Sequence, residues 1–184
     1  MLTIIIGKTC SGKSSIVKEL RKYGFHSILT TTTRPMRDGE AQDVDYHFTS
    51  EEEFLKKVEQ NFFTEYKAYN TKFGTWYYGS ARDDIVNAGD NDIIILTPEG
   101  YRDVVREYPD LAHRLVYIYA NNKTIKNRLM KRGDKKEEAE RRLKQDYADF
   151  RGVENLADRI VYNNENDKID DVVDKLRSYL EENS

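Results

Sequence analysis

The stretch Gly7-Lys8-Thr9-Cys10-Ser11-Gly12-Lys13-Ser14 decides the fold of this chain. It matches the pattern G-x-x-x-x-G-K-[ST] without a mismatch. In this pattern the glycines let the backbone curl, so that successive N–H groups point at phosphate oxygens. The lysine reaches the β- and γ-phosphates, and the serine hydroxyl binds Mg²⁺. The stretch therefore predicts a phosphate-binding loop for a nucleoside triphosphate.

The segments on either side of this loop fit that prediction. Leu2–Ile6 is a short β-branched run that indicates a buried parallel strand, and Ser14–Lys22 carries apolar residues at helical spacing. A helix that starts at the loop adds its positive end to the phosphate site. Further apolar runs predict strands at Asp92–Leu96, Leu115–Tyr119 and Ile160–Tyr162. Helical patterns lie at Ser80–Ala88, Thr124–Lys131, Lys135–Phe150 and Lys168–Leu180. The alternation predicts an α/β fold, a P-loop-type parallel sheet with helices on both faces.

Composition excludes several other classes of protein. The 184 residues carry a net charge of −3, from 30 basic and 33 acidic side chains, so no overall basic excess points to nucleic acid. No apolar run reaches the length of a membrane span, and Leu2–Ile6 is too short for the apolar segment of a signal peptide. Cys10 is the only cysteine, which rules out an intramolecular disulfide. We therefore expect a cytoplasmic protein, and the sequence leaves its oligomeric state open.

A second segment indicates what happens to the triphosphate. Thr31–Glu40 reads TTTRPMRDGE, and Asp45-Tyr46-His47-Phe48 follows it. Ser50 and the three glutamates after it begin a helix in capping-box fashion, and two aromatic-rich runs, Phe62–Tyr69 and Phe73–Tyr78, predict a pair of strands. These blocks resemble the guanylate kinase family, whose hallmarks are T-T-R-x-x-R-x-G-E and then D-Y-x-F. The resemblance extends more weakly through Arg128–Gly133 and Arg141–Leu143 to Ile160–Asn163, and so covers nearly the whole chain.

The resemblance implies a division of the chain into three parts. The core takes residues 1–30, 79–121 and 153–184, a small mixed-β acceptor-binding subdomain takes 31–78, and a helical lid takes 122–152. The acceptor phosphate needs cationic and hydroxyl donors, which arginines and tyrosines can supply, and a carboxylate can accept from the ring N–H and amino group of guanine. We expect Glu40 to orient an arginine and Glu65 to bind the base. The expected acceptor-binding residues are Thr30, Arg34, Arg37, Glu40, Tyr46, Glu65, Tyr78, Ser80 and Thr97.

The resemblance also implies an ATP site. We expect Gly7, Ser11, Gly12, Lys13, Ser14, Ser15 and Asn163 to bind ATP, with Ser14 as the protein ligand of Mg²⁺. Phosphoryl transfer depends chiefly on positioning and charge stabilisation. The expected catalytic residues are Lys13, Arg34, Arg132 and Arg142. The lid spacing is one residue shorter than the family pattern, so Arg141 remains an alternative to Arg142.

The chain departs from the family pattern in three places. Ile95 and Thr97 stand where the family carries two aspartates, which would serve the metal-water shell and the guanine amino group; Glu99 is a possible substitute. The stretch around Asn70–Gly74 is longer than usual. The extra aromatic residues nearby have no family role, and packing in a small sheet is their favoured interpretation. The residues concerned are Tyr66, Tyr69, Phe73 and Trp76.

Together these patterns predict a kinase that transfers the γ-phosphate of ATP to GMP or dGMP. One alternative is a kinase for IMP, another nucleotide or another phosphorylated metabolite, which the missing aspartates favour. Another is a non-catalytic guanylate-kinase-like interaction module, against which the intact Gly12-Lys13-Ser14 argues. A regulatory GTPase is disfavoured because Asn122-Lys123 is followed by Thr124 and not by the guanine-reading pattern N-K-x-D.

Overall fold

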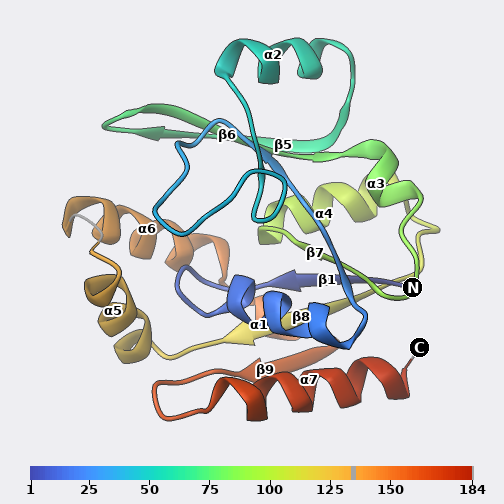
Figure 1. Cartoon of the computed structure of the whole chain (residues 1–184), viewed down its shortest axis with the longest axis vertical. Coiled ribbons are helices and arrows are strands. Elements are labelled where there is room, and N and C mark those ends of the chain that lie inside the picture. The colour runs from blue at the N-terminus through green and yellow to red at the C-terminus, as the bar shows by residue number, and fades with distance from the viewer. Residues whose placement is uncertain (134–135, 184) are drawn as a thin grey trace.

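The fold is built on two sheets, which a computed structural model places one above the other (Figure 1). The structure describes residues 1–133 and 136–183. Asp134, Lys135 and Ser184, which fall within the predicted lid, the predicted helix Lys135–Phe150 and the predicted core, lie outside the described residues.

The first sheet is parallel and has strand order β2-β7-β1-β8-β9. Its strands are β1 (Leu2–Ile6), β2 (His26–Ile28), β7 (Asp92–Ile95), β8 (His113–Tyr119) and β9 (Arg159–Tyr162). Strand β1 lies at the centre, between β7 and β8, which places the phosphate loop in the middle of the carboxyl edge. Ligand sites of open parallel sheets form at this edge.

Alternation along β1 explains why both faces of this sheet are covered. Ile5 packs with residues of α1 (Lys13–Leu20) and α7 (Ile169–Glu182) on one face. Leu2, Ile4 and Ile6 pack on the other face with Val104 of α4 (Pro98–Glu107). Every residue of β1 is buried, including Thr3, whose hydroxyl accepts from Arg114 Nε at 3.0 Å, as expected for a parallel strand covered by helices on both faces. The predicted α/β fold is therefore confirmed.

The second sheet is mixed, with strand order β4-β3-β6-β5, and lies above the parallel sheet with α2 (Glu51–Glu59) on its outer side (Figure 1). Its strands are β3 (Thr31–Thr32), β4 (His47–Phe48), β5 (Phe63–Thr71) and β6 (Gly74–Ala81). Ser50 caps α2 as predicted, because its Oγ accepts from Glu53 N at 3.2 Å. The remaining helical elements are η1 (Arg21–Tyr23), α3 (Arg82–Val86), α5 (Asn122–Lys131), α6 (Lys136–Asp149) and η2 (Val153–Asn155).

One predicted helix starts at the wrong residue, and another helix was not predicted. The predicted helix Ser80–Ala88 begins later, at Arg82, because Ser80 and Ala81 pair with β5 and extend β6. Helix α4 was missed, although Thr97 and Pro98 supply an N-cap residue and a proline in the first turn. This helix matters for function because it starts at the carboxyl end of β7, beside the phosphate loop.

Candidate active site

The phosphate loop has a backbone that requires glycine at its narrowest points. Gly12 has φ +98°, and a Cβ there would lie 2.2 Å from Asn163 Nδ2. A Cβ on Gly7 would lie 2.7 Å from the main-chain oxygen of Ile118. Cys10 also has a positive φ, of 54°, and packs beside the cluster of Ala120, Ile125 and Leu129. The loop is therefore held in shape by close contacts with β8 and with the segment after β9.

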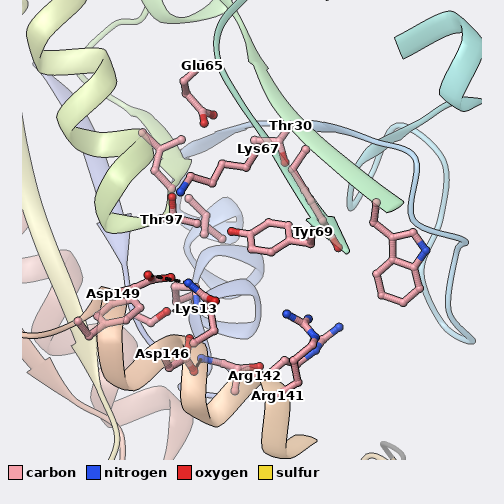
Figure 2. A pocket seen from close by; sticks show the side chains of 18 of the residues that line it. Lys13, Thr30, Glu65, Lys67, Tyr69, Thr97, Arg141, Arg142, Asp146 and Asp149 are labelled. Atoms are coloured by element: carbon pink, nitrogen blue, oxygen red, sulfur yellow. Dashed lines mark hydrogen bonds between the residues drawn. The ribbon is translucent and has the colours of Figure 1, made fainter. Parts of the chain in front are cut away.

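Lys13 lies inside the curl of this loop (Figure 2). Its Nζ donates to the main-chain oxygens of Gly7, at 2.5 Å, and Lys8, at 3.0 Å. Burial lowers the pKa of the Lys13 ammonium from 10.5 to about 8, and the negative charge of Asp146 opposes this shift. An ammonium that has lost its water and has only carbonyl partners is well placed to bind phosphate oxygens.

The hydroxyl groups of the loop differ in their surroundings. Ser11 Oγ is buried, and no described residue lies within hydrogen-bonding distance of it. Ser14 and Ser15 begin α1, and Ser14 lines a cavity on the acceptor side. Within residues 1–133 and 136–183 there is no group of three His, Cys, Asp or Glu side chains that could hold a metal. The Ser14 hydroxyl is an oxygen ligand of the kind that suits Mg²⁺, which takes most of its other ligands from nucleotide phosphates and water.

Asn163 supports the loop from behind. Its Nδ2 donates to the main-chain oxygen of Ser11 at 2.8 Å, and its Oδ1 accepts from Arg128 at 3.2 Å. Arg128 also donates to the main-chain oxygens of Cys10 and Ser11. Both ends of the buried Asn163 amide are thus engaged within the protein. We therefore propose that Asn163, expected to bind ATP directly, positions the loop together with Arg128.

The lowered pKa of Lys13 predicts a pH dependence of ATP binding. The phosphates of ATP bind the charged form of Lys13, so binding raises the pKa of this lysine. Above pH 8 the free protein has mostly neutral Lys13, and the affinity for ATP therefore depends on taking up a proton. Between that pH and the ordinary lysine value of 10.5, the affinity for ATP should fall about tenfold per pH unit. Titration calorimetry from pH 7 to 9.5 measures this slope, with GMP affinity as the control. Constant ATP affinity up to pH 9.5 would contradict the buried-lysine geometry.

The acceptor segment is organised around a buried ion pair. Arg34 is almost fully buried; its guanidinium donates to Glu40 Oε1 at 2.8 Å and to the main-chain oxygen of Pro35 at 2.7 Å. It also lies over the rings of Tyr46 and Phe48, 5.3 and 5.6 Å from their centroids. Glu40 thus orients an arginine, as the sequence suggested. Its second oxygen accepts from the Arg37 main-chain N–H at 2.9 Å, which fixes the turn that carries both arginines.

Arg37 lies near the positive charges of Arg34 and of Arg132 and Arg142. Burial lowers the pKa of its guanidinium, and the charge of Arg34 does so next. The lid residues Arg142 and Arg132 lower it further, which places both of them within electrostatic reach of Arg37. Arg132 also acts on Lys13. All of the expected catalytic residues therefore converge on one region, although they come from four separate parts of the chain.

Two adjoining cavities receive these side chains. The larger, of about 240 Å³, is lined by Thr9, Lys13, Glu65 and Thr97, with Glu65 and Lys13 toward opposite ends (Figure 2). The smaller, of about 130 Å³, contains Ser14, Arg37 and Glu40. Thr30, Tyr46 and Ile95 line both. Tyr78, whose ring meets Tyr46 edge to face at 6.2 Å, lines the larger cavity. Of the expected acceptor-binding residues, Arg34 and Ser80 line neither cavity and are joined to them through Glu40 and Glu65.

The Glu65 carboxylate lies at the far end of the larger cavity (Figure 2). Its Oε1 accepts from Ser80 Oγ at 2.6 Å, so Ser80 acts on a ligand through Glu65. Burial raises the pKa of Glu65, whereas the Ser80 hydrogen bond and the charge of Lys67 oppose that shift. Thr97 caps α4, because its Oγ1 accepts from Gly100 N at 3.0 Å. A carboxylate fixed by one hydroxyl in a buried cavity can accept from two adjacent N–H groups of a base.

Several residues that line the larger cavity were not predicted. Lys67 and Tyr69 lie there because they alternate with Glu65 along β5, and burial raises the pKa of Tyr69 to about 12. A strand period of two, applied to β5 from Glu65, could have found both. Trp76 also lines the cavity, whereas Tyr66 and Phe73 are exposed. Packing within the small sheet is therefore not the only role of these extra aromatic residues.

Asp146 was not predicted either, and it joins α6 to the phosphate loop. Its Oδ2 accepts from Thr9 N at 2.7 Å, and it lies close enough to Lys13 to oppose the lowering of that pKa. Burial raises the pKa of Asp146 itself. Helix α6 therefore lies against the loop, with Arg141, Arg142 and Asp149 along the same cavity (Figure 2). No pattern in the sequence predicts this contact, because helical spacing alone does not show which element packs against α6.

A phosphate-binding loop on a parallel sheet, which faces arginines from the segment between β3 and β4 and from α6, makes this chain a P-loop phosphotransferase. Comparison with known proteins narrows that class: the guanylate kinase model matches residues 1–183. The chain belongs to the guanylate kinase family, whose members are ATP-dependent phosphotransferases. Among the described helices, none combines the length and the apolar character needed to cross a membrane.

Individual relatives support this membership. The guanylate kinase of Clostridium tetani is 31% identical over 186 residues, which cover 98% of this chain and 85% of that protein. The guanylate kinase of Helicobacter hepaticus is 32% identical over 169 residues, which cover 88% and 82%. The crystal structure of guanylate kinase from Anaplasma phagocytophilum shares the fold, with a TM-score of 0.72, 19% identity, and coverage of 100% of this chain and 85% of that one.

Proposed function

We propose that this protein transfers the γ-phosphate of ATP to GMP, giving ADP and GDP. The observation that carries the proposal is the Glu65 carboxylate, held by Ser80 in the same cavity that contains Lys13 at its other end. The carboxylate matches the N1–H and amino group of guanine, and the lysine matches the phosphates of ATP. Membership in the guanylate kinase family supports the same assignment.

In this proposal the chain's own residues bind, orient and compensate charge. Lys13 and the loop amides bind the ATP phosphates, while Arg37 and the tyrosine hydroxyl of Tyr46 hold the acceptor phosphate. Arg34, fixed by Glu40, adds positive charge beside them. Mg²⁺, bound by Ser14 and the nucleotide, supplies further charge neutralisation when present. No general base is required, since positioning and charge stabilisation account for most of the catalysis of phosphoryl transfer.

The lid arginines and the division of the chain complete the proposal. Arg132 and Arg142 stabilise the charge that spreads over the transferring group, and α6 excludes water from it. The lid comprises residues 122–152, the acceptor subdomain 31–78, and the core the remaining ranges of the chain. A cytoplasmic location stays a prediction.

A coupled ADP-release assay tests the proposal with ATP, Mg²⁺ and the acceptors GMP, dGMP, IMP, AMP, CMP and UMP. We expect turnover with GMP or dGMP to exceed that with AMP, CMP and UMP by at least about a hundredfold, because only 6-oxopurines present a ring N–H to Glu65 at this position. In Glu65→Gln this preference should fall to about tenfold or less, since an amide offers a donor beside its acceptor. Unchanged selectivity in Glu65→Gln would remove Glu65 from the base site.

Arg37→Ala should separate the acceptor site from the ATP site. The guanidinium lies beside Glu40 on the acceptor side, and losing a charge-assisted contact with phosphate should weaken GMP binding about tenfold to a hundredfold. ATP affinity should change less than about threefold. Lys22→Ala, which removes an exposed lysine paired with Glu19, is the matched control. Equal losses of GMP and ATP affinity in Arg37→Ala would contradict the division of the site.

A further inference from the structure

A lysine lies in the acceptor cavity beside the carboxylate that binds the base. Lys67 is two residues from Glu65 on β5, so both side chains point to the same face of the strand and line the same cavity. Lys67 Nζ forms an ion pair with Glu99, in the first turn of α4. Figure 2 shows the Lys67 side chain extending across the cavity with its amino end toward Thr97. Because an ammonium has three N–H donors, the pair with Glu99 leaves donors for a ligand.

Lys67 approaches a side of the cavity formed by Thr97 and the N-terminal end of α4, which carries hydrogen-bond donors. The Thr97 hydroxyl oxygen already accepts from Gly100 N at 3.0 Å, which leaves its O–H to donate. Thr97 is the N-cap of α4, so the positive end of that helix faces the same side of the cavity. Glu99 is about half exposed and is not among the residues that line the cavity. Of the two carboxylates that act on Lys67, Glu65 and Glu99, Glu65 is therefore the one that lines the cavity, and donors lie beside it.

This arrangement discriminates between groups at C2 of a purine. Guanine presents two donors side by side, N1–H and the C2 amino group. With the C2 edge of the base directed at Lys67 and Thr97, the donors of these residues oppose the amino group. A purine with carbonyl groups at C2 and C6 presents N1–H to Glu65 and an acceptor oxygen beside it. The positive charge of Lys67 also offsets the repulsion between the Glu65 carboxylate and that oxygen, since the two side chains lie within electrostatic reach of each other.

We propose that Lys67 is a specificity-determining residue that donates to a carbonyl oxygen at C2 of the base, so that the site accepts the 2,6-dioxopurine nucleotide XMP as well as GMP. This inference rests on the proposed kinase activity and names a further acceptor for it. Glu99 holds Lys67 in position, and Thr97 supplies the neighbouring donor. IMP, which has only hydrogen at C2, serves as the reference acceptor.

The test compares kcat/KM for XMP, GMP and IMP in the wild type and in Lys67→Met, which keeps the length of the side chain and removes its charge. We expect the wild type to use XMP within about tenfold of GMP, because a single hydrogen bond to a base is worth about that factor. In Lys67→Met the ratio of XMP to GMP should fall at least about tenfold. Lys22→Met, outside the cavity, is the control and should leave the ratio unchanged.

A second variant approaches the same site from α4. Thr97→Asp places an acceptor on the side of the cavity that carries donors and should lower the ratio of XMP to GMP at least about tenfold, whether or not Lys67→Met is stable. The inference is overturned if the ratio of XMP to GMP is unchanged in both Lys67→Met and Thr97→Asp. It is also overturned if the wild type uses GMP but not XMP. A wild type that uses XMP but not GMP overturns the proposed function alone. No turnover with any of the three acceptors overturns both.

Discussion

Lys13→Ala should lower kcat at least about a thousandfold, which corresponds to about 4 kcal/mol of transition-state stabilisation. The expectation follows from the position of Nζ inside the phosphate loop, where its partners are main-chain oxygens of Gly7 and Lys8. An ammonium in this place stabilises the charge of the transferring phosphoryl group. Steady-state ADP release at saturating GMP measures the loss.

The fold of Lys13→Ala provides the necessary control. Burial lowers the pKa of Lys13 in the folded protein, so at neutral pH the charged form costs folding free energy relative to the unfolded chain. Removing it should therefore leave Tm unchanged or raise it. Thermal unfolding by circular dichroism tests this. A variant that unfolds well below the wild type would mean that Lys13 has a structural role, and a variant that keeps its activity would remove Lys13 from the reaction.

Arg142→Met should lower kcat about a hundredfold, whereas Arg141→Met should lower it less than about tenfold. The two residues are neighbours on α6, and the sequence leaves both open as the catalytic arginine of the lid. We favour Arg142, because its charge acts on Arg37, which we propose to bind the acceptor phosphate. Arg141 acts instead on Tyr69 of the acceptor hairpin. The magnitude is that of losing one preorganised donor to the transition state.

The pair of variants is its own matched control, since each removes one arginine from the same helical turn. Single-turnover rates separate an effect on the chemical step from an effect on nucleotide binding or product release. A larger loss in Arg141→Met would transfer the role to Arg141. Equal and small losses in both would mean that the charge near the transferring group comes from Lys13, Arg132 and the acceptor side.

The elements that the sequence predicts best are those with strong local signals. Strand β1, the phosphate loop and α1 are found together because a buried apolar run, a glycine pattern and a helical period follow one another. The predicted start of α3 is too early because the pairing of Ser80 with Glu65 depends on the partner strand β5 and not on the local helical spacing. Helix α4 is a different case. Thr97 and Pro98 are a local signal for its start, but the residues that follow are mostly polar and show no clear apolar spacing.

The site is predicted well where it depends on motifs and poorly where it depends on contacts. Arg34, Arg37 and Glu40 lie within one motif, and the structure brings them together as a turn. Asp146 could not be predicted, because its partner Thr9 is 137 residues away and the contact depends on how the lid lies on the core. Lys67 needed only the strand period, but its pairing with Glu99 required the position of α4.

Phosphorus NMR of a reaction with ATP, Mg²⁺ and GMP tests the central claim most directly, because it identifies the product that receives the phosphate. We expect the γ-phosphate signal of ATP to disappear while the β-phosphate signals of GDP and ADP grow in equal amounts, with no inorganic phosphate beyond that of a Lys13→Ala sample. Inorganic phosphate without GDP, or no change in ATP over the same time, would contradict the assignment of this site to phosphoryl transfer from ATP to GMP.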